Sequence, residues 1–392
     1  MAKIKLGDIC NFQSGGTPAK GIAEFFNGTI PWITTTALNG GKIDGTQAVD
    51  WITEKAIEKS AAKLVPAYSI MVGTRVGIGK VAVNTVEMST SQDIISLLDI
   101  DENHWNKDYI CKFVQGNSRF LNSKARGATI KGIKIDVLAS LELKEISLEE
   151  QVKISEIIDK VKNIINARKQ EIANLDSLIQ SRFVEIFGDL ANPESPWDKS
   201  KLIDVCTDKD DIKCGPFGTQ LSKDEYTESG VAVWEIPQIN SAFLTRPTHF
   251  LSKEKAEQLK AYTIVPGDIA MSRKGNVGKC AVFPENYPEG IIHSDVLRIR
   301  VDSKIINPRF LMSQLHFSGA VTRQIEMVSS GAIMAGVNVT KLKHIYIYVP
   351  PMNFQNQFVD FVAGIDKSKA AIQHSLDETQ VLFDSLMQKY FG

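Results

Sequence analysis

Two long stretches of the chain place apolar residues at alternating steps of four and three positions. The first stretch runs over residues 154–186 and the second over residues 358–390, and eight of the ten seam positions in each are apolar. Such a seam is typical of a coiled coil rather than of an ordinary surface helix. The pattern therefore predicts two long helices, each with an apolar stripe that needs a partner. The apolar seam positions are Ile154, Ile158, Val161, Ile165, Ile172, Leu175, Ile179 and Ile186 in the first helix, and Phe358, Val362, Ile365, Ile372, Leu376, Phe383, Leu386 and Tyr390 in the second.

The remaining segments have a different texture, with short β-type runs separated by Gly, Pro, Asn and Asp. Examples are "IPWITTTAL" at 30–38 and "AVWEIPQI" at 232–239. Short apolar runs bounded by turn residues predict a β-rich globular region ahead of each helix. Ser147 and Glu150 have the spacing of a capping box at the start of the first helix, and Pro350-Pro351 precede the second.

A collinear internal repeat relates the two halves of the chain. "KLGDIC" (5–10) matches "KLIDVC" (201–206), "GTIPW" (28–32) matches "GVAVW" (230–234), and "SQDIISL" (91–97) matches "HSDVLRI" (293–299). The second match places Trp32 against Trp234. The repeat predicts an α+β fold made by tandem duplication of a β-rich domain followed by a long helix. The predicted segments are a first domain (1–146), a first helix (147–190), a second domain (191–349) and a second helix (350–392).

Composition narrows the class of protein. At 392 residues the chain can bury two or three cores, and it has no apolar run of the ~18–20 residues that span a bilayer. Its N-terminus lacks the apolar core of a secretory signal. Five cysteines without CxxC spacing and six scattered histidines predict no metal site and no disulfide framework. We therefore expect a cytoplasmic protein with ordinary buried thiols.

The total charge of −1 hides a segregation of charge. Residues 141–190 hold ten acidic and seven basic residues, and residues 351–392 hold five and three, so the rest of the chain carries a net +4. Residues 118–134 contain five basic residues and no acidic one. This division favours basic globular domains that contact a polyanion, with acidic helices that contact protein.

Two glycine-rich stretches, "GTRVGIGKV" (73–81) and "SRKGNVGKC" (272–280), resemble phosphate-binding loops. A Walker A loop requires Ser or Thr after Gly-Lys and an earlier glycine, and both stretches lack both features. We therefore exclude nucleotide binding. No acidic residue lies within 71–84 or 270–282, and both stretches read Arg-x-Gly-x(1–2)-Gly-Lys, which matches Arg75 with Arg273 and Lys80 with Lys279. Glycines allow a backbone to approach a polymer closely while Arg and Lys neutralise phosphates, although a β-hairpin with solvated charges is the plainer alternative.

No catalytic constellation is found by motif: there is no GxSxG elbow, no HExxH and no Rossmann glycine pattern. "VPPM" (349–352) lacks the Asn and the aromatic residue of an amino-methyltransferase motif. We predict no catalytic residue and no cofactor in this chain. Binding without chemistry is the favoured interpretation.

The chain resembles the specificity subunits of type I restriction–modification systems over essentially its whole length. The resemblance rests on the order domain, helix, domain, helix, and on "KLGDIC", "GTIPWI", "VPAYSI"/"VPGDIA", "LEEQVKISEIID", "LDSLIQSRFVEIFGD" and "LFDSLMQKYFG". It implies two target recognition domains that each read half of a split DNA sequence, and two helices packed as an antiparallel coiled coil. It also implies that two modification (methyltransferase) subunits dock on the helices and carry S-adenosylmethionine, while ATP and Mg belong to partner subunits. Whether a restriction/translocase subunit joins them stays open.

Helix length then sets the separation of the half-sites. A helix of about 35 residues spans ~50 Å, which corresponds to ~15 base pairs. Base-reading candidates lie where the repeats diverge in matching loops, and loop cations are candidates for phosphate contacts. The predicted DNA-binding residues are Thr17, Thr34, Thr35, Thr36, Arg75, Lys80, Arg126, Lys131, Thr219, Gln238, Asn240, Arg273, Lys274, Lys279 and Lys341. The alternative hypothesis is a non-catalytic assembly scaffold that contacts only protein, and an enzyme with an undetected site is a third.

Overall fold

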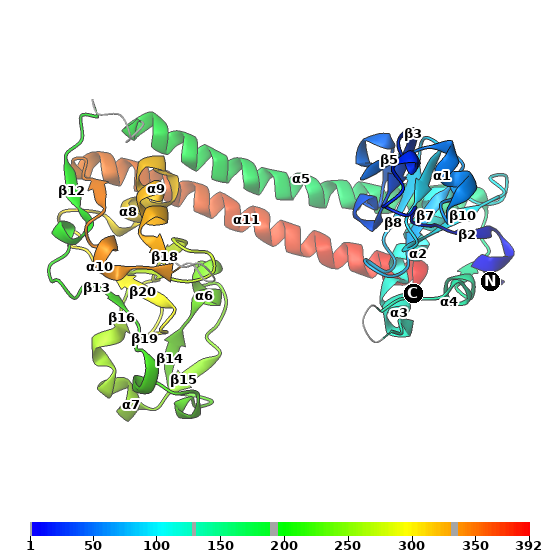
Figure 1. Cartoon of the computed structure of the whole chain (residues 1–392). Coiled ribbons are helices and arrows are strands. Elements are labelled where there is room, and N and C mark those ends of the chain that lie inside the picture. Colours follow the sequence, from blue (N-terminus) through cyan, green and yellow to red (C-terminus); the bar gives the residue numbers. More distant parts are fainter. Residues whose placement is uncertain (1, 128–130, 189–194, 331–335) are drawn as a thin grey trace. The chain divides into compact units, whose positions relative to one another are not determined.

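The structure is a computed structural model that describes residues 2–127, 131–188, 195–330 and 336–392. Packing divides the chain into two compact units: residues 1–169 with 373–392, and residues 170–372. Each unit consists of a mixed α+β domain, here called a head, and one half of each of two long helices (Figure 1). Residues 190 and 191, where the first helix was predicted to meet the second domain, lie outside the described residues.

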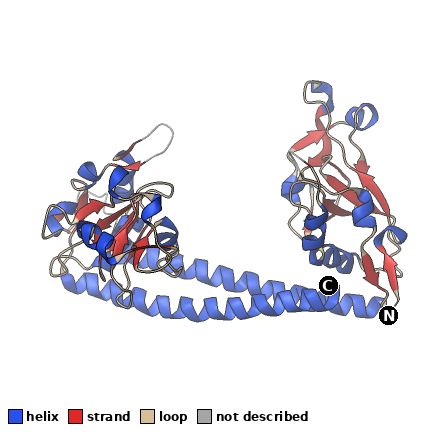
Figure 2. Cartoon of the chain, turned by 90° about the horizontal axis from the view of Figure 1, so that it is seen from below, coloured by secondary structure: helices blue, strands red, loops and turns tan. Residues whose placement is uncertain are grey.

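In its described residues the first head contains strands, drawn red in Figure 2, that form three sheets. Their strand orders are β2-β10-β7-β8-β4, β5-β3-β9-β6 and β1-β11. The strands are β1 (Lys3–Lys5), β2 (Asn11–Ser14), β3 (Phe26–Ile33), β4 (Lys42–Ile43), β5 (Asp50–Ile52), β6 (Leu64–Val65), β7 (Ile70–Gly73), β8 (Val81–Asn84), β9 (Met88–Thr90), β10 (Ile94–Leu98) and β11 (Glu142–Lys144). The helices are α1 (Glu54–Lys59), α2 (Lys107–Gly116), α3 (Ser118–Lys124), α4 (Ile135–Ala139) and the long α5 (Leu148–Phe187).

The second head repeats this topology except that its main sheet has no strand equivalent to β4 in the described residues. Its sheets have the orders β13-β20-β17-β18, β15-β14-β19-β16 and β12-β23, with a small additional pair β21-β22. The strands are β12 (Lys199–Lys201), β13 (Ile212–Cys214), β14 (Val231–Trp234), β15 (His249–Leu251), β16 (Thr263–Ile264), β17 (Ile269–Ser272), β18 (Cys280–Val282), β19 (Gly290–Ile292), β20 (Val296–Ile299), β21 (Ser329–Ser330), β22 (Gly336–Val337) and β23 (Tyr346–Tyr348). The helices are α6 (Ile236–Asn240), α7 (Lys253–Gln258), α8 (Pro308–Phe317), α9 (Gly319–Met327), α10 (Val339–Leu342) and the long α11 (Met352–Phe391). The predicted α+β duplication is confirmed.

Strand register corrects one detail of the predicted repeat. In the first head Ile33 pairs with Thr90, and in the second head Trp234 pairs with Ile292, the residue at the position equivalent to Thr90. Trp234 is therefore equivalent to Ile33, and Trp32 was matched to it wrongly by one position. Because successive side chains of a strand point to opposite faces, this shift buries the two tryptophans in different clusters. Trp32 packs with Phe25, Ile52, Ala56 and Ala62, whereas Trp234 packs with Ile239, Phe243, Ala270, Ala281 and Phe283.

The two long helices run antiparallel within each unit. In the first unit the start of α5, at Ile154 and Ile158, shares a cluster with Phe391 at the end of α11. In the second unit the end of α5, at Phe183 and Phe187, packs against Phe358 near the start of α11. The coiled-coil packing predicted from the sequence is confirmed. The predicted seam residues Ile158, Val161, Ile165, Ile179 and Leu376 are buried, and Ile172, Leu175, Ile365, Ile372, Phe383 and Leu386 are half-buried.

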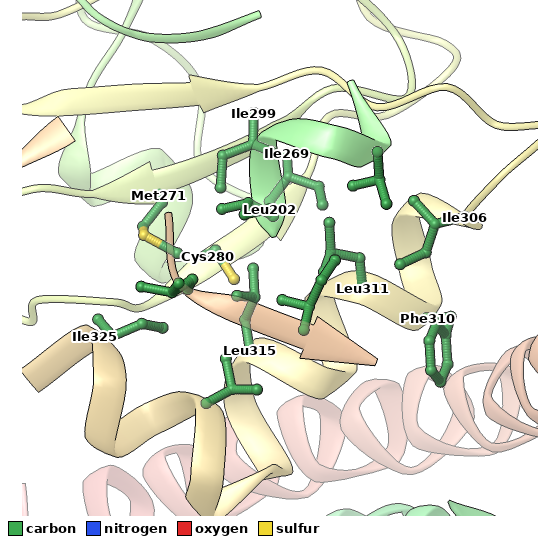
Figure 3. Close-up of a cluster of buried hydrophobic side chains, with 14 of the residues drawn as sticks. Leu202, Ile269, Met271, Cys280, Ile299, Ile306, Phe310, Leu311, Leu315 and Ile325 are labelled. Atoms are coloured by element: carbon green, nitrogen blue, oxygen red, sulfur yellow. The ribbon is translucent and has the colours of Figure 1, made fainter. Parts of the chain in front are cut away.

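The aromatic C-terminal end of each long helix packs in the core of the head that belongs to the other repeat. Phe391, at the end of α11, lies 5.3 Å from the Tyr109 ring of the first head. Phe187, at the end of α5, lies 4.8 Å from the Phe310 ring of the second head. Figure 3 shows the core that Phe310 joins, where strands β17, β18 and β20 meet helices α8 and α9. Burial of these large rings provides hydrophobic stabilisation that fastens the helix ends to the heads.

Candidate nucleic-acid interface

The glycine-rich stretch of the first head is the turn of the β7–β8 hairpin. Gly77 and Gly79 have φ angles of +72° and +80°, which favour glycine because a Cβ is disfavoured there. The backbone closes on itself: Gly79 N donates to Gly73 O at 3.0 Å, and Gly73 N donates to Lys80 O at 2.9 Å. A phosphate-binding P-loop connects a strand to a helix, whereas this loop connects two antiparallel strands. This stretch therefore does not have the strand–loop–helix geometry of a P-loop.

The equivalent loop of the second head connects β17 to β18 and has the same closure. Gly278 N donates to Ser272 O at 3.2 Å, and Ser272 N donates to Lys279 O at 2.7 Å. This pattern makes Lys279 equivalent to Lys80, as predicted. The residue equivalent to Arg75 is Lys274, however, and not Arg273 as the sequence match had it.

Arg273 occupies the position of Thr74 and has a different environment. Its guanidinium lies 4.8 Å from the centre of the Phe217 ring, and its Nε donates to the Val337 carbonyl at 3.4 Å. The sequence match failed because the loop glycines are displaced: Gly77 and Gly275 stand at different positions in turns of equal length. The spacing between the cations and the glycines therefore did not identify Lys274 as the residue equivalent to Arg75.

A basic cavity adjoins the loop of the first head. A cavity of about 530 Å³ is lined by residues that include Arg75, Lys124, Arg126 and Lys134. Arg126 forms a backbone pair with Gly132, with N···O distances of 2.9 Å in both directions. All four cationic side chains are exposed, so their charges meet at one surface that phosphates can approach. The predicted Lys131 is also exposed, while residues 128–130 beside it lie outside the described residues.

The corresponding region of the second head is less basic. A cavity of about 640 Å³ between the loop and helices α8 and α9 is lined by Lys279 and by apolar residues such as Val277, Leu315 and Ile325. His316 also lines it and accepts a hydrogen bond from Cys280 N at 3.1 Å. Burial, assisted by the charge of Lys279, lowers the pKa of His316. Lys341, a predicted phosphate contact, is exposed on α10.

The candidates for base reading divide into accessible and inaccessible groups. Thr36, Thr219 and Asn240 are exposed, and Thr17 and Thr34 are half-buried. The Thr34 and Thr36 hydroxyls lie 2.8 Å apart at the turn that follows β3. These five residues remain candidates for DNA contact.

Two of the base-reading candidates are corrected by the structure. Thr35 is buried at 6% exposure. Gln238 is 2% exposed; its Oε1 accepts from Glu235 N and its Nε2 donates to Arg246 O. Both polar atoms of the Gln238 amide are thus used to fix the turn around α6, and they cannot read a base edge in this conformation. The adjacent Arg246, which the sequence reasoning missed, is exposed at the same turn.

An acidic residue missed by the sequence reasoning lies beside one cation of each loop. Arg75 Nη1 is 3.4 Å from Asp93 Oδ1, and Lys274 Nζ is 2.7 Å from Asp295 Oδ1. The available signal was the aspartate shared by "SQD" (91–93) and "HSD" (293–295) in the repeat. Among the residues that the structure describes, Lys80 and Lys279 form no ion pair.

All five cysteines are free thiols, four of them buried. Burial raises the pKa of the Cys10, Cys111 and Cys206 thiols to about 12 and that of Cys214 to about 11. No cluster of three metal-binding side chains is found in the described ranges, and no helix there is long and apolar enough to cross a membrane.

Comparison with known proteins gives a consistent result. A family model described as "Type I restriction modification DNA specificity domain" matches residues 1–175 and 194–379. The chain is 22% identical to the type I restriction enzyme MjaIX specificity subunit of Methanocaldococcus jannaschii, over 98% of this chain and 91% of the relative. It is 32% identical to the EcoR124I/EcoR124II specificity subunit of Escherichia coli over 47% of this chain and 46% of that one. A solved chain from a study of complex assembly and conformational transition of the type I R-M system has a TM-score of 0.63 at 15% identity, covering 100% of this chain and 97% of that chain.

Proposed function

Because the chain belongs to the family of type I restriction–modification DNA specificity domains, we propose that it is the specificity subunit that reads a bipartite DNA target through its two heads. The observation that carries this proposal is that the family match occurs twice, once in each repeat. Each matched copy also contains the same β-hairpin with cations at two equivalent loop positions, Arg75 and Lys80 or Lys274 and Lys279. A repeated domain can read two different half-sites, whereas a symmetric dimer reads a palindrome.

The chain then supplies recognition, and partner subunits supply the chemistry. Two modification subunits with S-adenosylmethionine bind this cytoplasmic chain and methylate the DNA it selects. The acidic helices α5 and α11 are the natural place for protein partners, and the basic heads for DNA. ATP and Mg, where a restriction subunit is present, belong to that subunit.

In each head we assign phosphate contacts to the loop cations, and in the first head also to the cationic side chains around its basic cavity. Phosphate contacts hold the register of a protein on DNA, and base-edge contacts by other side chains give the sequence. Thr36 in the first head and Asn240 in the second are the favoured base-reading candidates because both are exposed.

The proposal is tested with the complex of this chain and its modification partners. Mapping of methylated bases in a genome that expresses the complex first identifies the target. Binding to a duplex that contains the target is then measured over a range of salt concentrations for the Arg75→Ala/Lys80→Ala and Lys274→Ala/Lys279→Ala variants. We expect weaker binding and a salt slope lower by about 0.9 for each lost phosphate contact.

The matched control is Lys59→Ala/Lys63→Ala, which removes the same charge from exposed positions of the first head. It should leave the slope close to that of the wild type. If the complex binds no DNA at low salt, or if the loop variants behave like the control, the chain does not contact DNA as proposed. The first of these results favours the scaffold hypothesis.

A further inference from the structure

An aspartate is held beside the same loop cation in both heads. Asp93 immediately precedes β10 and faces the start of the β7–β8 turn, because Thr74 N donates to Asp93 O at 2.8 Å. Asp295 immediately precedes β20, and Arg273 N donates to Asp295 O at 2.9 Å. The sheet register therefore places the carboxylate next to the loop cation, independently of any ligand.

The pairing is retained although the cation differs between the heads. Arg75 and Asp93 are 3.4 Å apart, and Lys274 and Asp295 are 2.7 Å apart. All four side chains remain partly accessible, with exposed fractions of 47% for Arg75, 30% for Asp93, 44% for Lys274 and 28% for Asp295. An accessible pair of this kind is weak enough for a phosphate to compete with the carboxylate.

The aspartate imposes a cost on DNA contact at these two positions. A DNA phosphate that binds Arg75 or Lys274 must displace the aspartate carboxylate from it. The unpaired carboxylate then repels the DNA backbone. Lys80 and Lys279 impose no such cost, because neither forms an ion pair within the described part of the chain. Each loop thus combines one cation without an ion pair, Lys80 or Lys279, with one that is partly neutralised, Arg75 or Lys274, and the second loop also contains Arg273 over the Phe217 ring.

We propose that Asp93 and Asp295 are specificity-determining residues that neutralise the loop cations Arg75 and Lys274 on non-target DNA. On target DNA, base contacts hold the backbone close to the loop, and the cation transfers from the carboxylate to a phosphate. The aspartates thereby lower non-specific affinity more than specific affinity. This inference rests on the proposed function, since it assumes that the two loops face DNA.

The test uses the Asp93→Asn/Asp295→Asn variant of this chain, assembled with its modification subunits. Affinity is measured for a duplex that contains the target and for one of the same length and composition without it, each over a range of salt concentrations. We expect about three- to tenfold tighter binding per head to non-target DNA, a smaller change on target DNA, and a non-target salt slope steeper by about 0.9 per head.

The matched control is Glu58→Gln/Glu285→Gln, which removes two exposed acidic charges from the same heads at positions without an ion pair in the described chain. This control should change the affinity for the two duplexes by the same factor. An unchanged ratio of target to non-target affinity in the aspartate variant, or an equal loss of binding to both duplexes, would overturn the inference. If the wild-type complex does not prefer its target at all, the proposed function fails instead, so the two failures are distinguishable.

Discussion

Apart from β4 in the first head and the β21-β22 pair in the second, the two heads share their strand order, but they have different surfaces beside the same hairpin. In the first head the loop adjoins a cavity lined by four cations, and in the second the adjoining cavity is largely apolar and is lined in part by the half-buried ring of His316. The loop closure and the cation–aspartate pair are common to both. Backbone hydrogen bonding and the sheet register therefore preserve the framework, while side chains around it are free to differ. A subunit that reads two different half-sites requires this combination of a shared framework and divergent surfaces.

The largest effect is expected from the aromatic helix ends. Phe187→Ala should destabilise the second unit, and Phe391→Ala the first, each by about 3–5 kcal/mol, because truncation of a buried ring leaves a cavity. Phe187 is 2% exposed and Phe391 5%. Amide hydrogen exchange, resolved by peptide, checks which unit loses protection.

The matched control for the helix ends is Val381→Ala, on α11 in the first unit, because Val381 is 70% exposed. It should change protection little. An equal loss of protection in both units after Phe187→Ala alone would mean that the two units unfold as one, and would contradict the separation into units.

An intermediate effect is expected from acidification of the second head. Because the pKa of His316 is lowered in the folded state, its neutral form contributes stability that is fully present above the ordinary histidine pKa of about 6.5. That stability is lost as the pH falls below 6.5 through the lowered pKa. His316→Gln, which can still accept from Cys280 N, should flatten this pH dependence in the second unit.

The measurement is the unfolding midpoint or exchange protection of each unit between pH 7.5 and 5. The control is His344→Gln, since His344 is exposed in the same head. If the second unit of the wild type and of the His344→Gln variant loses stability with acid no more steeply than that of the His316→Gln variant, the half-buried imidazole does not have this role.

The smallest effect is expected from two equivalent glycines. A Cβ added at Gly132 would lie 2.9 Å from Arg75 Cγ and 3.2 Å from Thr74 O, whereas one added at Gly336 would lie 3.7 Å from its nearest neighbour, Arg273 O. Gly132→Ala should therefore displace Arg75 and weaken DNA binding modestly, at a cost of about 1 kcal/mol or less in stability. Gly336→Ala serves as the control and should bind DNA as the wild type does. Equal binding by both variants would show that the position of Arg75 does not depend on close approach at Gly132.

The helices and the duplication could be predicted because they depend on local periodicity. Alternating steps of four and three identify a helix with one buried stripe wherever they occur, and Ile158, Val161 and Ile165 are buried as this pattern requires. The exposed loop cations Arg75, Lys80 and Lys279 could also be anticipated, because charged side chains in a glycine turn rarely become buried. Their role in DNA contact stays a prediction.

Other residues could not be placed from their neighbours in the sequence. Gln238 was chosen as a polar loop residue, and only the fold shows that its amide caps the turn at Glu235 and Arg246. Trp32 and Trp234 look equivalent in the sequence, yet strand pairing separates them by one position and hence by one face.

The sequence by itself determined the order of the elements, the duplication and the helical seams, because each of these is written in spacings of a few residues. The tertiary structure decided which residues meet across long separations: Asp93 with Arg75, Phe391 with Tyr109, and Lys274 rather than Arg273 in the position of Arg75. The physical reason is that strand register and helix docking are set by the sum of many buried contacts. A shift of strand register by one residue changes the pairing partner of every residue in the strand, although the local sequence pattern stays the same.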